Sequence, residues 1–305
     1  MRIVRTLIAV VLAAILLAST AVRADPVEEK DVISGKAKLD PAKGYILVSG
    51  PVRQIGMFLR VPDETTIAAW EKDRQKALDK ALRAYKQDHA NWQILADNAK
   101  ANHTAPPPEP PMPTLQTVKV DPPELRDMAA FGPQFVYAKG ETVYYLQAVK
   151  PGTYVWYGSV MGGNGLPAGG TCMCMGTVRF EVKPGVVTDT GNWFIAAPKW
   201  AEDMDVARMT ATEAAAKRAA EGKEPRKTFV VDAIRFGLPA SLKAWPSAQP
   251  EFHASGKLNN FFGIFISRLP PVPDILGYHR DIPVDLRTGQ EIESPTLVSR
   301  AKIKK

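Results

Sequence analysis

ETVYYLQAVKPGTYVWYGSV, residues 141–160, is the stretch that decides the fold of this chain. Residues 141–149 are rich in Tyr and Val, and residues 153–160 are aromatic and β-branched, so both segments favour β-strands. Lys150-Pro-Gly-Thr153 between them is typical of a turn, because proline presets φ at the first corner and glycine accepts a positive φ at the second. We therefore predict a hairpin of two strands in a mainly β protein.

The same turn signal recurs at residues 183–186, which read KPGV and predict a second hairpin of similar make. The 26 prolines and 22 glycines are spread along the chain and divide it into short segments, as in a protein of strands and turns. We expect an antiparallel β-sandwich core in a single domain that spans residues 25–300. Further strands are predicted at residues 45–50, 55–61, 115–120, 134–137, 177–182, 186–193, 228–236, 261–266 and 282–286.

A long amphipathic helix is predicted over residues 64–100, with Asp63 as its N-cap. An unbroken helix of this length would reach about 55 Å, so we expect either a break or a partner. It could lie across its own sheet, or form an arm that meets another molecule. The proline-rich spacer 105–113 is predicted to be stiff and extended and to return the chain to the sheet. A second, Ala-rich surface helix is predicted near residues 203–221. The apolar positions of the long helix are Ile67, Trp70, Leu78, Leu82, Tyr85, Trp92 and Leu95.

Residues 1–24 have the pattern of a secretory signal peptide. Arg2 and Arg5 precede an apolar run over residues 7–17, and Val22-Arg23-Ala24 places small residues at the positions that a signal peptidase reads. We expect cleavage before Asp25, and a mature chain in the periplasm or outside the cell, in an oxidising environment. No later segment is long and apolar enough to predict a transmembrane helix.

The charge of the chain excludes one class of partner. The formal net charge is +7, and it falls to +4 once Arg2, Arg5 and Arg23 are removed with the signal peptide. A nucleic-acid-binding protein would show a basic stripe with interleaved aromatic residues, and the main basic cluster here is the tail 301–305, which we expect to be solvated. We therefore predict no nucleic-acid partner.

Both cysteines of the chain, Cys172 and Cys174, lie in one Cys-x-Cys element. Three interpretations stay open. The thiols could pack as small apolar groups or form a structural disulfide. They could form a labile, redox-active bridge. Together with Met175 they could also bind Cu(I), because thiolate and thioether are soft ligands. On a regular strand, Met175 would point to the opposite face from the cysteines, which weakens the copper hypothesis.

Three aromatic residues, Tyr154, Trp156 and Tyr157, form a second candidate site. They could fill the core on one face of the sheet and form a cross-strand ladder on the other. They could instead present a stacking surface for a glycan or a peptide.

No catalytic residue is predicted from the motifs. The chain has no H-E-x-x-H, no G-x-S-x-G and no C-x-x-C. The glycine-rich segment 162–170 lacks the G-K-[ST] of a phosphate-binding loop, so we interpret it as a loop at the rim of the sheet. His279 and Asp281, in the charged C-terminal part, are interpreted as solvated. The motifs thus favour a non-enzyme, without a cofactor unless the Cys-x-Cys element binds copper.

The segments YLQAVKPGTYV, residues 145–155, and GTVRFEVKPGVV, residues 176–187, followed by Gly191, support a resemblance. They resemble small prealbumin-like or carboxypeptidase-regulatory-like β-sandwich modules of bacterial envelope proteins, over residues 130–195. The resemblance implies a non-catalytic module and supplies no active-site residue. We expect an exported envelope protein that acts as a binding or structural module, with an envelope protein or a glycan as partner. The alternative is a periplasmic thiol-redox or Cu(I)-handling protein.

Overall fold

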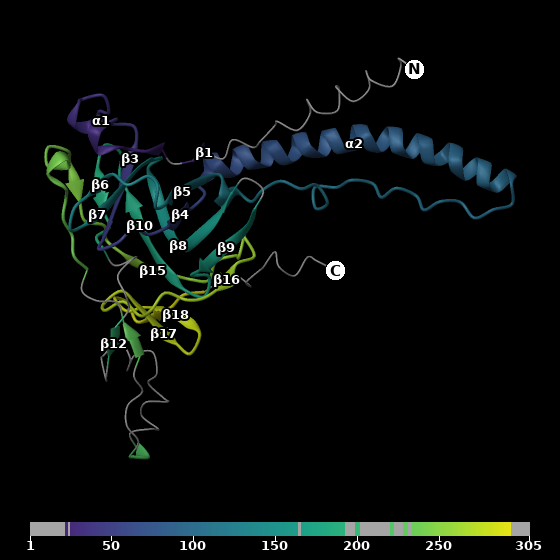
Figure 1. Cartoon of the computed structure of the whole chain (residues 1–305). Helices are drawn as coiled ribbons and strands as arrows, with labels where there is room; N and C mark the ends of the chain where they lie inside the picture. The colour runs from purple at the N-terminus through teal and green to yellow at the C-terminus, as the bar shows by residue number, and fades with distance from the viewer. Residues whose placement is uncertain are drawn as a thin grey trace. The chain divides into compact units, whose positions relative to one another are not determined.

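The chain folds into two compact units (Figure 1). The computed structural model describes residues 22–23, 25–163, 166–192, 199–201, 220–222, 228–230 and 234–293. Unit 1 combines the chain before Pro62 with the chain after Arg126, and unit 2 is Pro62–Arg126. The helical insertion predicted at residues 64–100 lies within unit 2.

Unit 1 is mainly β, as the sequence predicts, and two sheets of its described residues face each other. The eight-stranded sheet has the order β1 (Val22–Arg23), β5 (Asp127–Phe131), β4 (Gly56–Arg60), β8 (Gly152–Gly163), β10 (Thr177–Val182) and β15 (His253–Ser255), with β9 (Leu166–Cys172) beside β8 and β16 (Phe265–Ile266) beside β9. The six-stranded sheet has the order β14 (Ser247–Ala248), β11 (Val187–Asp189), β3 (Gly44–Gly50), β7 (Val143–Val149) and β2 (Asp25–Pro26), with β6 (Ala138–Lys139) beside β7.

Smaller elements complete the described part of unit 1. A three-stranded sheet contains β17 (Leu276–His279), β18 (Ile282–Asp285) and β19 (Gln290–Glu291), and a two-stranded sheet pairs β12 (Lys199–Ala201) with β13 (Thr228–Val230). The helices are α1 (Glu29–Ile33) and the 3-10 turn η2 (Ala240–Leu242).

Both Lys-Pro-Gly turns carry the chain from one sheet to the other, so the prediction of two hairpins is wrong. Lys150-Pro151 joins β7 of the six-stranded sheet to β8 of the eight-stranded sheet. Lys183–Val186 joins β10 back to β11, and Gly185 there has φ +69°, as its turn position requires. The first turn passes over the edge of the core, because β7 and β8 bury side chains in the same cluster. The second turn joins β10, which packs in that cluster, to β11, whose Val187 packs in a second one. Strands β3 and β4 likewise belong to different sheets.

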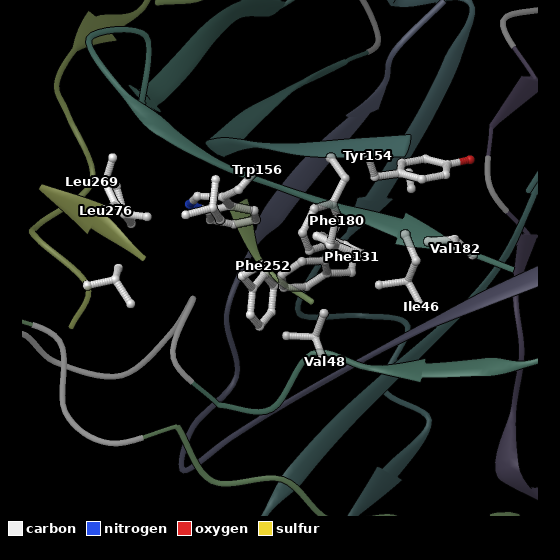
Figure 2. Close-up of a cluster of buried hydrophobic side chains, with 14 of the residues drawn as sticks. Ile46, Val48, Phe131, Tyr154, Trp156, Phe180, Val182, Phe252, Leu269 and Leu276 are labelled. Atoms are coloured by element: carbon white, nitrogen blue, oxygen red, sulfur yellow. The ribbon is translucent and has the colours of Figure 1, made fainter. Parts of the chain in front are cut away.

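The core lies between the two sheets, and β3 is buried on both of its faces. Ile46 and Val48 point into the inter-sheet cluster, whereas Tyr45 and Leu47 pack in a second cluster with Leu242 of η2. This arrangement follows from the alternation of side chains along a strand. Figure 2 shows the inter-sheet cluster, in which Ile46 and Val48 lie near three phenylalanine rings.

Gln147 is a polar residue within this apolar core. It lies between Tyr145 and Val149 on β7, is 1 % exposed, and neither of its amide atoms has a hydrogen-bond partner among the described residues. A buried amide without a partner costs about 1–3 kcal/mol. We expect Gln147→Met, which keeps the size of the side chain, to raise the free energy of unfolding by about 1 kcal/mol in urea titrations. The exposed Gln134→Met is the control and should change it by less than about 0.5 kcal/mol; a loss of stability in Gln147→Met would contradict this account.

Several predicted elements differ from the structure. Residues 115–120 form no strand, because they belong to an extended segment of unit 2 that contains prolines and a turn at Thr114–Val118. Residues 134–137 form a turn and a bend, and the strand begins only at Ala138. The strand predicted at 261–266 contracts to Phe265–Ile266, since Asn260 bonds the backbone of Ile264 and holds a turn there. The surface helix predicted near 203–221 falls almost wholly outside the described residues.

Unit 2 consists of one long helix and an extended return segment (Figure 1). Helix α2 spans Glu64–Ala101 without a break, and the carboxylate of Asp63 accepts a hydrogen bond from the Thr66 N–H at 2.8 Å, as expected of an N-cap. No residue of α2 is fully buried. Within the residues that the structure describes, no helix has both the length and the apolar character that crossing a membrane requires.

The return segment, residues 104–122, runs antiparallel along α2 and ends in the 3-10 turn η1 (Pro123–Leu125). The indole N–H of Trp92 donates to Pro107 O at 2.9 Å, and that of Trp70 donates to Asp121 O at 3.0 Å. Arg74 donates to Leu115 O between them, at 2.8 Å. An extended proline-rich chain has free carbonyl groups, and the long side chains of α2 supply their donors. The sequence analysis expects a helix of this length to have a break or a partner. Its own return segment is one such partner.

The hydrogen bond of Trp92 gives a test of this packing. We expect Trp92→Phe to lower stability by about 0.5–1.5 kcal/mol, because the carbonyl of Pro107 loses its donor while most of the ring contact remains. The change should be confined to unit 2, so hydrogen exchange should become faster in α2 and stay unchanged in β3 and β7. Equal acceleration in both units would contradict this expectation. Gln93→Leu, at an exposed neighbouring position, is the control.

Candidate functional sites

The Cys-x-Cys element lies at the end of β9, and its two cysteines form a disulfide in the structure. The Cα atoms of Cys172 and Cys174 are 5.1 Å apart, and both residues are 0 % exposed. The backbone around them is held from two sides, because Tyr157 O accepts the N–H of Met173 at 2.8 Å and Cys172 O accepts the N–H of Ser267 at 2.8 Å. The disulfide is thus enclosed where β8, β9 and the chain around residue 267 meet.

This environment limits the chemistry of the disulfide. A thiolate can attack a disulfide sulfur only if it reaches it, and here the bridge must first be uncovered by local opening. Copper(I) binding requires free thiolates, so the bridge would first have to accept two electrons and become two cysteines. Met175 is half-buried beside it, and Met173 packs against the inter-sheet core. In the described part of the chain, no cluster of three or more His, Cys, Asp and Glu side chains suits a metal ion.

The disulfide closes a loop of only three residues, so we expect it to contribute less to stability than a disulfide that closes a long loop. Chain-entropy arguments give about 2 kcal/mol for so short a loop. The free energy of unfolding from urea titrations should therefore be about 2 kcal/mol lower when the titration contains a reductant that breaks the disulfide. Unfolding by reductant alone, without urea, would contradict this expectation.

The three aromatic residues predicted as a candidate stacking surface are core residues. Tyr154, Trp156 and Tyr157 are 1 %, 2 % and 0 % exposed. Tyr154 and Trp156 lie in the inter-sheet cluster (Figure 2), and the hydroxyl of Tyr154 donates to Lys150 O at 2.8 Å. Tyr157 points to the other face of the sheet, where its ring packs on Phe261 and Phe262. Burial raises the pKa of Tyr154. In this structure none of the three offers a face to a ligand.

The charged C-terminal residues form ion pairs. His279 pairs with Glu291, and Lys257 lies 3.3 Å from Asp281 and lowers the pKa of that carboxyl group. Asp281 is largely exposed, at 68 % of its side chain. His279 and Asp281 thus pair with different residues, as expected of solvated charges on a surface.

A groove in unit 2 is a candidate site that the sequence analysis missed. It has a volume of about 660 Å³ and lies between α2 and the return segment. The spacing of three alanines on the helix, opposite a proline-rich segment, is the signal that could have indicated it. Its lining consists of Ala77, Lys80, Ala81 and Ala84 from α2, and of Pro111, Met112, Pro113, Thr117, Val118 and Lys119 from the return segment.

Two cations lie at this groove. Neither Lys80 nor Lys119 forms a hydrogen bond or an ion pair with any residue in the described ranges. Lys76, one turn before Lys80, lies 3.3 Å from Asp73. The groove thus combines an apolar floor with two ammonium groups that form no ion pair with the residues that the structure describes.

The chain was compared with protein-family models, curated proteins and solved structures. No protein-family model matches it, and neither does any curated protein or any solved structure. The resemblance to prealbumin-like modules stays a prediction, and the groove of unit 2 and the enclosed disulfide are the features on which a function can be argued.

Proposed function

We propose that this protein is an exported, non-catalytic component of a bacterial cell envelope, which acts as a binding or structural module through unit 2. The signal-peptide pattern of residues 1–24 supports export. The disulfide between Cys172 and Cys174 is consistent with an oxidising compartment, where such bonds persist.

One observation supports a binding role for unit 2. Helix α2 spans Glu64–Ala101, and none of its residues is fully buried. Unit 2 is held together by hydrogen bonds from the side chains of Trp70, Arg74 and Trp92 to carbonyl groups of the return segment. Ordering a long segment has a large entropic cost, and a contact surface for a partner would explain why the chain maintains it.

Site-specific photocrosslinking in intact cells tests this role. A photoreactive amino acid replaces Ile94 or Leu95 on α2, which are 61 % and 56 % exposed, and the control replaces Ile33 on α1, which is 72 % exposed. We expect discrete crosslinked species from the two α2 positions and none from the control position. Crosslinking confined to position 33, or no crosslinked species from α2, would overturn the proposal.

The alternative function is a thiol-redox or Cu(I)-handling role for Cys172, Cys174 and Met175. The observation that favours it is that both cysteines of the chain are close enough to bond to each other beside a thioether. Thiol titration of the native protein, with mass measurement, separates the two functions. A binding module should keep its disulfide in mild reductant. A redox or copper protein should be reduced rapidly and then retain Cu(I) through dialysis.

A further inference from the structure

We propose that the groove of unit 2 binds an anionic amphiphile with one alkyl chain and a phosphate or carboxylate headgroup. This proposal rests on the binding role proposed above and names the class of ligand. The alkyl chain would lie on the floor of the groove, between α2 and the return segment, and the headgroup would meet Lys80 and Lys119.

The floor of the groove suits an alkyl chain because its side chains are small and apolar. Ala77, Ala81 and Ala84 leave room along the helix, and the prolines at 111 and 113 face them from the return segment. Each CH₂ group removed from water adds to the free energy of binding. Met112, which is 64 % exposed, adds an unbranched thioether side chain that adapts to the shape of a ligand.

The same lining disfavours an extended peptide. Proline has no backbone N–H, so residues 111 and 113 offer a peptide no donor. The N–H groups of Thr117 and Val118 both bond Thr114 O, at 3.1 Å each, and the Thr117 hydroxyl accepts the N–H of Thr114 at 2.8 Å. The polar groups of a peptide would find few partners and would be desolvated at a cost, whereas an alkyl chain needs none.

Charge complementarity selects an anionic headgroup. Lys80 and Lys119 both line the groove and lack a carboxylate partner among the described residues. Arg83, three residues after Lys80, extends the basic side of α2. A charge-assisted bond from an ammonium group to a phosphate or carboxylate is stronger than a neutral hydrogen bond. A second copy of the chain is a poorer occupant, because a two-fold contact at this groove would place the same basic surface of both copies against each other.

The size of the groove fits a small ligand. Its volume of about 660 Å³ lies within the range of roughly 300–1,000 Å³ that is usual for small-molecule sites. A groove open along one side would cover the chain of a single lipid without enclosing it.

The test uses the mature chain with its disulfide intact and three C12 amphiphiles below their micelle concentrations. Dodecyl phosphate is the anionic probe, dodecyl maltoside the neutral one and dodecyltrimethylammonium the cationic one. Binding is measured by calorimetry. We expect dodecyl phosphate to bind at least about tenfold more tightly than the other two, which corresponds to about 1.4 kcal/mol.

Two variants and a matched control locate the site. Ala84→Leu, at an exposed position of the lining, should fill the groove and weaken dodecyl phosphate binding about tenfold or more. The double variant Lys80→Glu/Lys119→Glu should have a similar effect. Lys72→Glu/Lys86→Glu makes the same change of charge at exposed positions of α2 outside the lining, and it should change the affinity less than about twofold. Circular dichroism checks that all variants keep the helix.

Three results would overturn the proposal. One is equal affinity for all three amphiphiles, which would indicate nonspecific detergent binding. Another is an unchanged affinity in Ala84→Leu. The third is tighter binding of an acidic, leucine-containing peptide than of dodecyl phosphate, which would make the occupant a peptide. Each would leave the crosslinking test of unit 2 unaffected, so the failure of this proposal is distinguishable from a failure of the proposed function.

Discussion

Phe58→Ala is expected to lower the free energy of unfolding by about 3–5 kcal/mol, the range typical of a fully buried phenylalanine. Phe58 is 0 % exposed, and its ring centre lies 5.1 Å from that of Trp156, 5.5 Å from that of Phe180 and 5.9 Å from that of Phe131. The substitution leaves a cavity at the point where these rings meet, and it removes aromatic pairs that each add about 0.5–1.5 kcal/mol. Chemical unfolding followed by near-UV circular dichroism measures the loss.

The matched control for this substitution is Phe265→Ala. Phe265 lies on β16 and is 72 % exposed. Its replacement should change stability by less than about 0.5 kcal/mol. Similar losses for Phe58 and Phe265 would show that the aromatic cluster is not the centre of the core.

Asp127→Ala is expected to lower the free energy of unfolding by about 3–5 kcal/mol, because it breaks the buried ion pair that this carboxylate forms with Arg60. Arg60 and Asp127 stand at the end of β4 and the start of β5, where the chain leaves and re-enters unit 1, and they are 9 % and 7 % exposed. Arg60 Nη1 lies 3.3 Å from one carboxylate oxygen, and Arg60 Nε donates to Pro151 O at 2.9 Å. Urea titrations measure the loss.

Two further variants test whether the stability lost in Asp127→Ala comes from the broken ion pair or from lost packing. Lys150 binds the same carboxylate at 2.8 Å, but its side chain is 54 % exposed, so Lys150→Met should cost only about 0–1 kcal/mol. The double variant Arg60→Met/Asp127→Leu removes both buried charges and should recover most of the stability lost in Asp127→Ala. A double variant as unstable as the single one would contradict an explanation based on the broken ion pair.

The elements that the sequence predicts well are those with local signals. Helix α2 begins after the predicted cap Asp63 and ends one residue after the predicted limit, because its periodicity and its cap are both short-range properties. Strand β10 has the predicted bounds, since it lies between clear turn signals.

The pairing of strands depends on contacts that are distant in sequence. The turn at Lys150-Pro-Gly indicates that the chain changes direction, but not whether β8 returns to the sheet of β7. That choice depends on partners such as Tyr45, which pairs with Ala148, and Phe58, which lies opposite Trp156. Turn chemistry carries no information on these partners.

The candidate sites also depend on contacts between residues that are distant in sequence. Tyr154 and Trp156 are buried in the inter-sheet core, and the other face of β8 is covered as well. Tyr157 is buried because Phe261 and Phe262, about a hundred residues later, pack on it, and no local pattern indicates that. The groove of unit 2 likewise forms only when the return segment packs against α2.

The intact mass of the protein isolated from its native cells is the decisive test of the proposed export. We expect a periplasmic or secreted chain that begins at Asp25, lacks two hydrogen atoms because Cys172 and Cys174 are bonded, and does not react with thiol reagents. A full-length chain that retains Met1, lies in the cytosolic fraction and carries two reactive thiols would contradict it.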